Sequence, residues 1–124
     1  MASKQAVWGI DVGQSILKAI KLQRAGEQVE MLAFDVVEHA NILSESEGDS
    51  TQLSTESLKT FLSRNKIADS RVVVSVPGQQ TLTRFTKMPP VEPKKIPDMV
   101  QYEASQQIPF DIDEVVWDYQ VFTE

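Results

Sequence analysis

The chemically most suggestive residues lie near the N-terminus, in the segment Gly9-Ile10-Asp11-Val12-Gly13-Gln14-Ser15 and at Lys18. A carboxylate at the end of a strand, here Asp11, can orient a water molecule bound to Mg²⁺. Gly13 lets the backbone bend, so that consecutive N–H groups converge on an anion. Ser15 adds a hydroxyl donor, and Lys18 brings a cation near the same turn. These residue types predict a phosphate-binding loop with a magnesium ion beside Asp11.

A second interpretation of this segment is a plain β-hairpin turn. Gly13 and Ser15 would then only make the turn, with the carboxylate of Asp11 hydrogen-bonded to it, because the pattern D-x-G is common in turns. The spacing of the glycines fits neither a Walker loop nor a dinucleotide-binding fingerprint. The loop alone therefore leaves both interpretations open, and its place between two predicted strands favours the phosphate-binding one.

Length and charge limit the classes of partner. The chain has 124 residues, of which 41% are hydrophobic, so it can form one domain, or one domain and part of a second. Twelve basic and eighteen acidic residues give a net charge of −6. This balance argues against nucleic acid or an anionic membrane surface as the main partner, because both reward clustered Lys and Arg. A single triphosphate is not excluded, because backbone N–H groups and a metal ion can hold it.

Residue types that the sequence lacks exclude other kinds of site. The chain has no cysteine, which excludes disulfides and thiolate metal sites. His39 is the only histidine, so a zinc site or a histidine-based catalytic triad would lack partners. The first residues, MASKQAVWGID, contain no apolar segment long enough for a signal peptide or a membrane span. The sequence therefore predicts a cytoplasmic protein.

Alternation of residue types predicts the first half of the fold. Three consecutive strands joined by short turns should form an antiparallel meander over residues 7–12, 16–22 and 29–37. Residues 38–52 have the polar composition of a loop. A helix should follow from an N-cap at Ser54 or Thr55 to about Asn65, with Leu58, Phe61 and Leu62 on one face. A β-branched strand over 71–76, stopped by Pro77-Gly78, completes the order of a ribonuclease-H-like half-domain.

The second half of the sequence predicts a smaller strand–helix–strand unit. A strand is expected over 81–88, a helix over 94–107 and another strand over 115–122. A proline at position 93 or 97 would stand in the first turn of the helix, where a missing N–H does no harm. Two strands and one helix cover each other poorly, so we expect a further strand to be missing from this unit.

Two parts of the sequence resemble known families. The segment WGIDVGQSILKAIKL resembles the first phosphate-binding hairpin of the actin, heat-shock chaperone and sugar kinase superfamily. More narrowly, VVVSVPGQQTLTRFTKMP and VQYEASQQIPFDIDEVVWDYQVF are similar to PilM proteins of type IV pilus assembly. In that family a strand ending in V-P-G leads to a helix that ends in E-A-x-x-x-I-P-F, then an acidic turn and a D-Y/F-Q-V strand. The resemblance extends from about Val7 to Phe122, and Ile108-Pro109-Phe110 is its more specific part.

This resemblance implies an α/β fold in two parts. A ribonuclease-H-like (actin-like) half-domain, subdomain 1A, would cover residues 1–78 in part. An inserted strand-helix-strand subdomain of the 1C or SHS2 type, as in the cell-division relative FtsA, would cover residues 79–124 in part. Family members continue for some two further subdomains, which carry the second phosphate loop and the adenosine pocket, and nothing in this sequence matches those. The expected fold class is therefore a truncated actin-like one.

The resemblance also implies a nucleotide site. The family binds ATP with Mg²⁺ and has weak ATPase activity at most. Asp11, Gly13, Gln14, Ser15 and Lys18 fall on its phosphate loop, with Asp11 at the metal. Gln14 stands where the family often has a second Ser, which keeps the backbone donors but replaces a small hydroxyl by a long amide. One loop alone gives a nucleotide few contacts, so we expect weak or no ATP binding, and no hydrolysis, by this chain alone.

The resemblance implies a protein partner as well. PilM proteins hold the cytoplasmic N-terminal tail of the inner-membrane protein PilN in a groove between the two subdomains. A PilN-like partner would bring this protein to the inner face of the inner membrane only indirectly. The groove would be lined near Phe85, Met88, Val100 and Ile108, with backbone groups available to an extended peptide. For each residue taken singly, packing of helix against strand is the simpler interpretation, and self-association stays open.

Two other classes of protein remain as alternatives. The N-terminal lobe of a sugar kinase also begins with G-I-D-x-G-x-S, but it should lack the helix ending at Ile108-Pro109-Phe110. A purely structural module, like the cytoplasmic part of the type II secretion protein GspL, shares the architecture and uses no nucleotide. A thermal shift caused by a sugar would favour the first alternative. Unchanged nucleotide binding and pilus function in an Asp11→Ala variant would favour the second.

Overall fold

The chain is a mixed α/β protein that divides into two compact units. The computed structural model describes residues 5–46 and 50–123. The first unit extends to Thr81, and the second begins at Leu82. This division lies close to the boundary predicted between residues 78 and 79, although the identity of the units as subdomains 1A and 1C stays a prediction.

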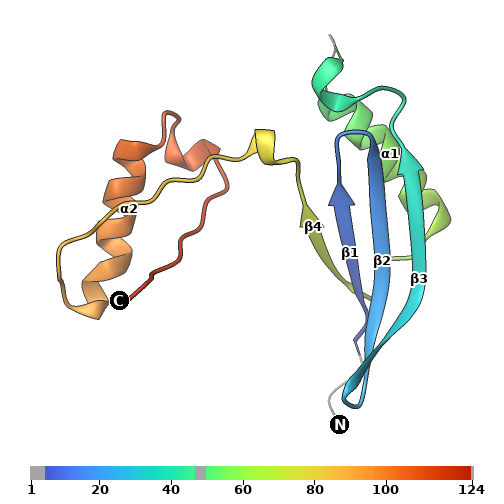
Figure 1. Cartoon of the computed structure of the whole chain (residues 1–124), viewed down its shortest axis with the longest axis horizontal. Helices are drawn as coiled ribbons and strands as arrows, with labels where there is room; N and C mark the ends of the chain where they lie inside the picture. Colours follow the sequence, from blue (N-terminus) through green and yellow to red (C-terminus); the bar gives the residue numbers. More distant parts are fainter. Residues whose placement is uncertain (1–4, 47–49, 124) are drawn as a thin grey trace. The chain divides into compact units, whose positions relative to one another are not determined.

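The first unit is built on a four-stranded sheet (Figure 1). Its strands are β1 (Val7–Val12), β2 (Ile16–Ala25), β3 (Gln28–Glu38) and β4 (Arg71–Ser75). Their spatial order is β3-β2-β1-β4, with β1–β2 and β2–β3 antiparallel and β4 parallel to β1. The predicted antiparallel meander is therefore confirmed. Both β2 and β3 are longer than predicted, because the only turn between them is at Gly26, which has a φ of +68° that favours glycine.

The helix of the first unit begins earlier than the sequence predicts. Helix α1 extends over Ser50–Arg64, so the expected N-cap at Ser54 or Thr55 is wrong. The hydroxyls of these two residues donate instead to the carbonyls of Ser50 and Thr51, four residues earlier, as they do inside a helix. A short 3₁₀ turn at Leu43–Glu45 also lies within the stretch that was predicted as loop. The end of the helix agrees with the prediction to within one residue.

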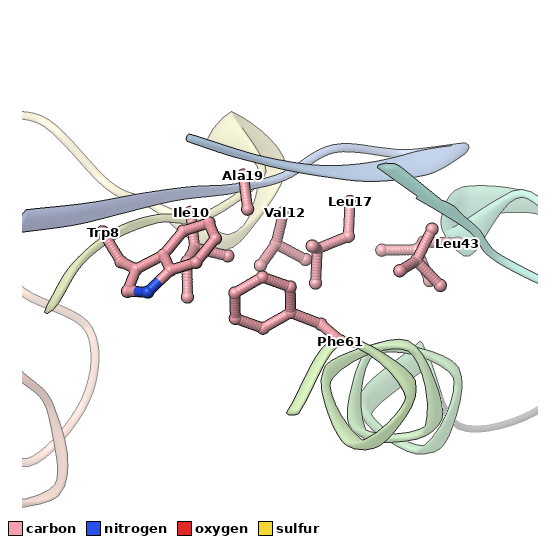
Figure 2. Close-up of a cluster of buried hydrophobic side chains, with 8 residues drawn as sticks. Trp8, Ile10, Val12, Leu17, Ala19, Leu43 and Phe61 are labelled. Carbon is pink, nitrogen blue, oxygen red and sulfur yellow. The ribbon is translucent and has the colours of Figure 1, made fainter. Parts of the chain in front are cut away.

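The hydrophobic core lies between α1 and one face of the sheet (Figure 2). Alternation along the strands places Trp8, Ile10 and Val12 on this face. Phe61 points from α1 toward the sheet and is fully buried, and its ring meets that of Trp8 edge to face, with centroids 5.1 Å apart. The remaining core residues, contributed by β2, β3 and the 3₁₀ turn, are Leu17, Ala19, Val37 and Leu43. Of the residues predicted on one face of this helix, Phe61 is fully buried, whereas Leu62 is 47% exposed.

The second unit contains one helix and no strand among its described residues. Helix α2 extends over Ile96–Gln107, preceded by a 3₁₀ turn at Pro93–Lys95 and followed by another at Ile112–Glu114. The strands predicted over 81–88 and 115–122 are not formed. A strand needs a hydrogen-bonded neighbour, and a pair of strands with one helix is marginal without further cover. The strand–helix–strand prediction is thus borne out for the helix only, and strand pairing in the SHS2 type is not observed.

Candidate functional site

Asp11 is the centre of a row of polar residues that crosses three strands. The register places Asp11 on β1 opposite Lys18 on β2 and opposite Ser75 on β4. The ammonium of Lys18 lies 3.1 Å from Oδ2 of Asp11, and the hydroxyl of Ser75 donates to Oδ1 at 2.6 Å. The side chains of Asp11 and Lys18 are 51% and 54% exposed. Because Asp11 alternates with buried residues along β1, this row lies on the face of the sheet opposite the core.

These neighbours keep Asp11 ionised. The hydrogen bond from Ser75, followed by that from Lys18, lowers the pKa of the Asp11 carboxyl below its ordinary value of 3.8. Asp11 is therefore a carboxylate at neutral pH, which is the form that can accept a hydrogen bond from a metal-bound water. Among the described residues, Asp11 does not belong to a group of three or more Asp, Glu or His side chains that could hold a metal ion.

The loop that follows Asp11 needs glycine at position 13. The N–H of Gly13 donates to the carbonyl of Ile16 at 3.0 Å and so closes the hairpin. A Cβ atom at Gly13 would lie 2.8 Å from that same carbonyl oxygen. Such a distance is shorter than carbon and oxygen atoms tolerate, so another residue would displace the loop backbone. Glycine is required here by close approach rather than by a positive φ.

Three consecutive carbonyls of this loop are bound from one side. Nε2 of His39 lies 2.9 Å from the carbonyl oxygen of Gly13. The N–H of Leu43 donates to the carbonyl of Gln14, and the N–H of His39 donates to that of Ser15, both at 2.9 Å. All of these donors belong to residues 39–43, the segment that follows β3. The segment therefore fixes the orientation of three successive peptide groups.

This arrangement sets the direction of the loop N–H groups. The described peptide bonds are all trans, and in a trans peptide the C=O and N–H point to opposite sides. The N–H groups of Gln14, Ser15 and Ile16 consequently point away from residues 39–43. Within the described residues no protein group accepts from the N–H of Gln14 or Ser15, and Ser15 is exposed. N–H groups without a protein acceptor can donate to a bound anion.

The side chain of Gln14 connects the loop to two other segments. Its carbonyl oxygen accepts from the N–H of Ser44 at 3.0 Å, and its amide nitrogen donates to the side chain of Gln79. Gln14 thus spans the chain after β3 and the 3₁₀ turn Gly78–Gln80 that follows β4. The side chain of Gln14 therefore has a structural role, and its backbone N–H remains available.

An open cavity of about 940 Å³ lies beside the loop on the side of α1. Its lining includes the carboxylates of Glu38, Glu45 and Glu56, as well as Ser15 and His39. Neither Asp11 nor Gly13 lines it. Three carboxylates repel a phosphate, so this cavity is a poor place for a nucleotide, and the candidate site is the loop itself.

The predicted partner-binding residues all belong to the second unit. Val100 lies on α2, and Ile108 is its C-cap residue. Phe85 and Met88 lie in the extended segment before the 3₁₀ turn at Pro93. Phe85 is 86% exposed, whereas Met88, Val100 and Ile108 are half-buried. Apolar surface is thus available in this unit, which has no fully buried residue among those described.

Three residues that bear on the site were missed by sequence reasoning. Ser75 completes the contacts of Asp11, and only the register of β4 against β1 reveals it. His39 binds the loop at Gly13, and Ser57 binds His39. The positions of both residues in the sequence did indicate that they face the core. His39 continues the inward alternation of Val37. Ser57 stands four residues before Phe61, on the same face of α1.

The order of elements defines a mixed α/β protein whose first β-hairpin carries Asp11 beside a glycine-containing loop. The family model described as type IV pilus assembly protein PilM matches residues 9–124, nearly the whole sequence. The chain therefore belongs to the PilM family. The match includes both the loop at Asp11 and the segment Ile108-Pro109-Phe110.

A search among curated proteins found no match. Among the described residues, α1 and α2 included, no helix combines the length and apolar character needed to cross a membrane.

Proposed function

We propose that this chain contributes the first phosphate-binding loop of an actin-like, nucleotide-binding scaffold that acts in type IV pilus assembly. Membership of the PilM family supports the role in pilus assembly. The order of three antiparallel strands, a helix and a parallel strand supports a ribonuclease-H-like half-domain. In this proposal the protein works in the cytoplasm and reaches the inner membrane through a partner. It acts as a scaffold, with nucleotide as a ligand rather than a substrate that this chain turns over.

One observation carries the nucleotide part of the proposal. The carbonyls of Gly13, Gln14 and Ser15 are all bound by residues 39–43, so the following N–H groups point to the other side. The ionised Asp11 stands at the end of β1, directly before this loop. Phosphate oxygens would accept from the loop N–H groups, and Asp11 would orient a water of the Mg²⁺ that accompanies ATP.

A nuclear magnetic resonance titration tests this proposal. ATP with Mg²⁺ should shift the amide signals of Gln14, Ser15 and Ile16 in the ¹⁵N-labelled chain, with a Kd on the order of 1 mM because one loop makes few contacts. Adenosine, which lacks phosphates, should leave these signals unchanged. The proposal fails if ATP shifts none of the three amides, or if adenosine shifts them equally.

The partner in this proposal is the cytoplasmic tail of a PilN-like inner-membrane protein. An extended peptide would contact the apolar surface near Phe85, Met88, Val100 and Ile108. The large exposed fraction of Phe85 supports its availability to a partner.

Substitution of Phe85 by Ala should weaken binding of such a peptide about tenfold or more. The matched control is Val116→Ala, an even more exposed apolar residue outside the predicted groove, and it should bind the peptide as the parent chain does. If the parent chain and Phe85→Ala bind the peptide equally well, Phe85 is not part of the proposed groove.

A further inference from the structure

His39 is joined to the loop twice and to α1 once. Its backbone N–H donates to the carbonyl of Ser15, and its Nε2 lies 2.9 Å from the carbonyl of Gly13. Its Nδ1 lies 2.6 Å from the hydroxyl of Ser57 on α1. We infer that His39 is a positioning residue, which Ser57 orients, and that it holds the loop in the shape that binds phosphate. This inference rests on the proposed nucleotide site.

Hydrogen-bond chemistry fixes how the imidazole is oriented. A carbonyl oxygen can only accept a hydrogen bond, so the proton of the neutral imidazole must be on Nε2 to reach Gly13. Nδ1 then carries a lone pair and accepts from the hydroxyl of Ser57, which can donate. The imidazole therefore accepts a hydrogen bond from Ser57 on α1 and donates one to Gly13 in the loop.

Burial separates this pair from ordinary surface contacts. His39 is 8% exposed and Ser57 is 4% exposed, and they are the two buried polar side chains among the described residues. Both have their hydrogen bonds made. An apolar residue at position 39 would continue the inward pattern of Val37 and would be sufficient if the position served only to pack the core. A buried imidazole at this position supplies what an apolar residue cannot, a donor for the carbonyl of Gly13.

The hydrogen bond from the imidazole to Gly13 adds a third fixed carbonyl to the two that backbone N–H groups already hold. The N–H groups of His39 and Leu43 hold the carbonyls of Ser15 and Gln14, and the imidazole holds the third carbonyl, at the start of the loop. Loss of the imidazole would free the peptide between Gly13 and Gln14 to rotate. The N–H of Gln14 would then leave the common direction, while Leu43, buried in the core, would still anchor the end of the loop.

The tautomer of His39 gives a first test that needs no variant. Long-range ¹H–¹⁵N spectra of the parent chain at neutral pH distinguish a proton on Nε2 from one on Nδ1. The inference predicts the Nε2–H tautomer. A proton on Nδ1 would mean that the imidazole does not bond to Gly13, and it would overturn the inference regardless of any ligand.

Variants give a second test. His39→Leu removes the donor, whereas His39→Gln can still donate to Gly13 and accept from Ser57. The control is Phe61→Leu, which disturbs the same core at a residue with no hydrogen-bonding side chain. Without ligand, the heteronuclear NOE at Gln14 should fall in His39→Leu and remain near the parent value in His39→Gln and Phe61→Leu. An equal fall in Phe61→Leu would show a general loss of stability and would contradict a positioning role.

ATP binding then separates this inference from the proposed function. His39→Leu should weaken the affinity for ATP with Mg²⁺ about fivefold to tenfold, and His39→Gln should restore most of it, because one loop hydrogen bond is worth about that factor. Parent-like affinity in a folded His39→Leu chain would overturn the inference. If ATP fails to bind the parent chain, the proposed function fails, and the tautomer and the ligand-free NOE values alone decide whether His39 holds the loop.

Discussion

Ser75 donates a 2.6 Å hydrogen bond to the carboxylate of Asp11, across the parallel pairing of β4 with β1. The two residues are 64 positions apart in the sequence and lie opposite each other in the sheet. Lys18 contacts the second carboxylate oxygen from β2, on the other side of β1. The orientation of Asp11 is therefore set by the sheet and not by the loop that follows it.

The first prediction concerns the charge of Asp11. Substitution of Ser75 by Ala removes the largest cause of the lowered pKa, so the pKa of Asp11 should rise toward 3.8. A carboxyl ¹³C titration measures this value. Ser70→Ala is the matched control, because Ser70 donates to Asp69 and should raise the pKa of Asp69 alone. An unchanged pKa of Asp11 in Ser75→Ala would contradict the assigned cause.

The second prediction concerns the pH dependence of stability. The pKa of Asp11 is lower in the folded chain than its ordinary value, so its ionised form favours the folded state above that value. This contribution is lost as the pH falls below about 4 and through the lowered pKa of the folded state. The free energy of unfolding should therefore decrease less on acidification in Asp11→Asn than in the parent chain. Denaturation curves at each pH would contradict this prediction if the free energy of unfolding of the two chains decreased by the same amount on acidification. The effect should be small, because the side chain is half-exposed.

The third prediction concerns the close approach at Gly13. Gly13→Ala should cost about 1–3 kcal/mol of stability and abolish the response of the loop amides to ATP, because the new Cβ would meet the carbonyl of Ile16. Gly78→Ala is the control, since no atom lies within 4 Å of a Cβ there, and it should change stability by about 0.5 kcal/mol or less. Urea denaturation measures both. Equal stability of the two variants would show that the loop tolerates a side chain at position 13.

The fourth prediction concerns the core that supports the site. Phe61→Ala should destabilise the first unit by about 3–5 kcal/mol, because it removes a fully buried ring that contacts Trp8. Leu62→Ala, at the next position on α1, should cost about 1 kcal/mol or less because Leu62 is about half-exposed. Comparable losses of stability in the two variants would show that Phe61 is not a central residue of the core.

Much of the first unit could be predicted from local pattern. Alternation and turn residues gave the three antiparallel strands, and β-branched residues gave β4, because these signals reside in neighbouring residues. The start of α1 was misplaced, because Ser54 and Thr55 have the composition of an N-cap but bond backward to Ser50 and Thr51. The residue type does not distinguish the two uses.

The candidate site was predicted only in part. Asp11 and Gly13 could be named as candidates from their types and their place between two predicted strands, although the pattern D-x-G also occurs in plain turns. Ser75 could not be named in this way, because its contact with Asp11 depends on the register of β4 against β1. The burial of His39 could have been inferred from alternation, but its contacts with Gly13 and Ser57 could not. The strands expected in the second unit have suitable residues, but a strand forms only with a hydrogen-bonded neighbour.

The central claim is that the loop after Asp11 binds the phosphates of ATP together with their metal ion. Replacement of Mg²⁺ by paramagnetic Mn²⁺ tests it most directly, because Mn²⁺ broadens the signals of nuclei close to it. With Mn²⁺ and ATP, the amide signals from Asp11 to Ile16 should broaden first, and with Mn²⁺ and adenosine they should not. Broadening confined to the acidic cavity at Glu45 and Glu56, with sharp loop signals, would contradict the account.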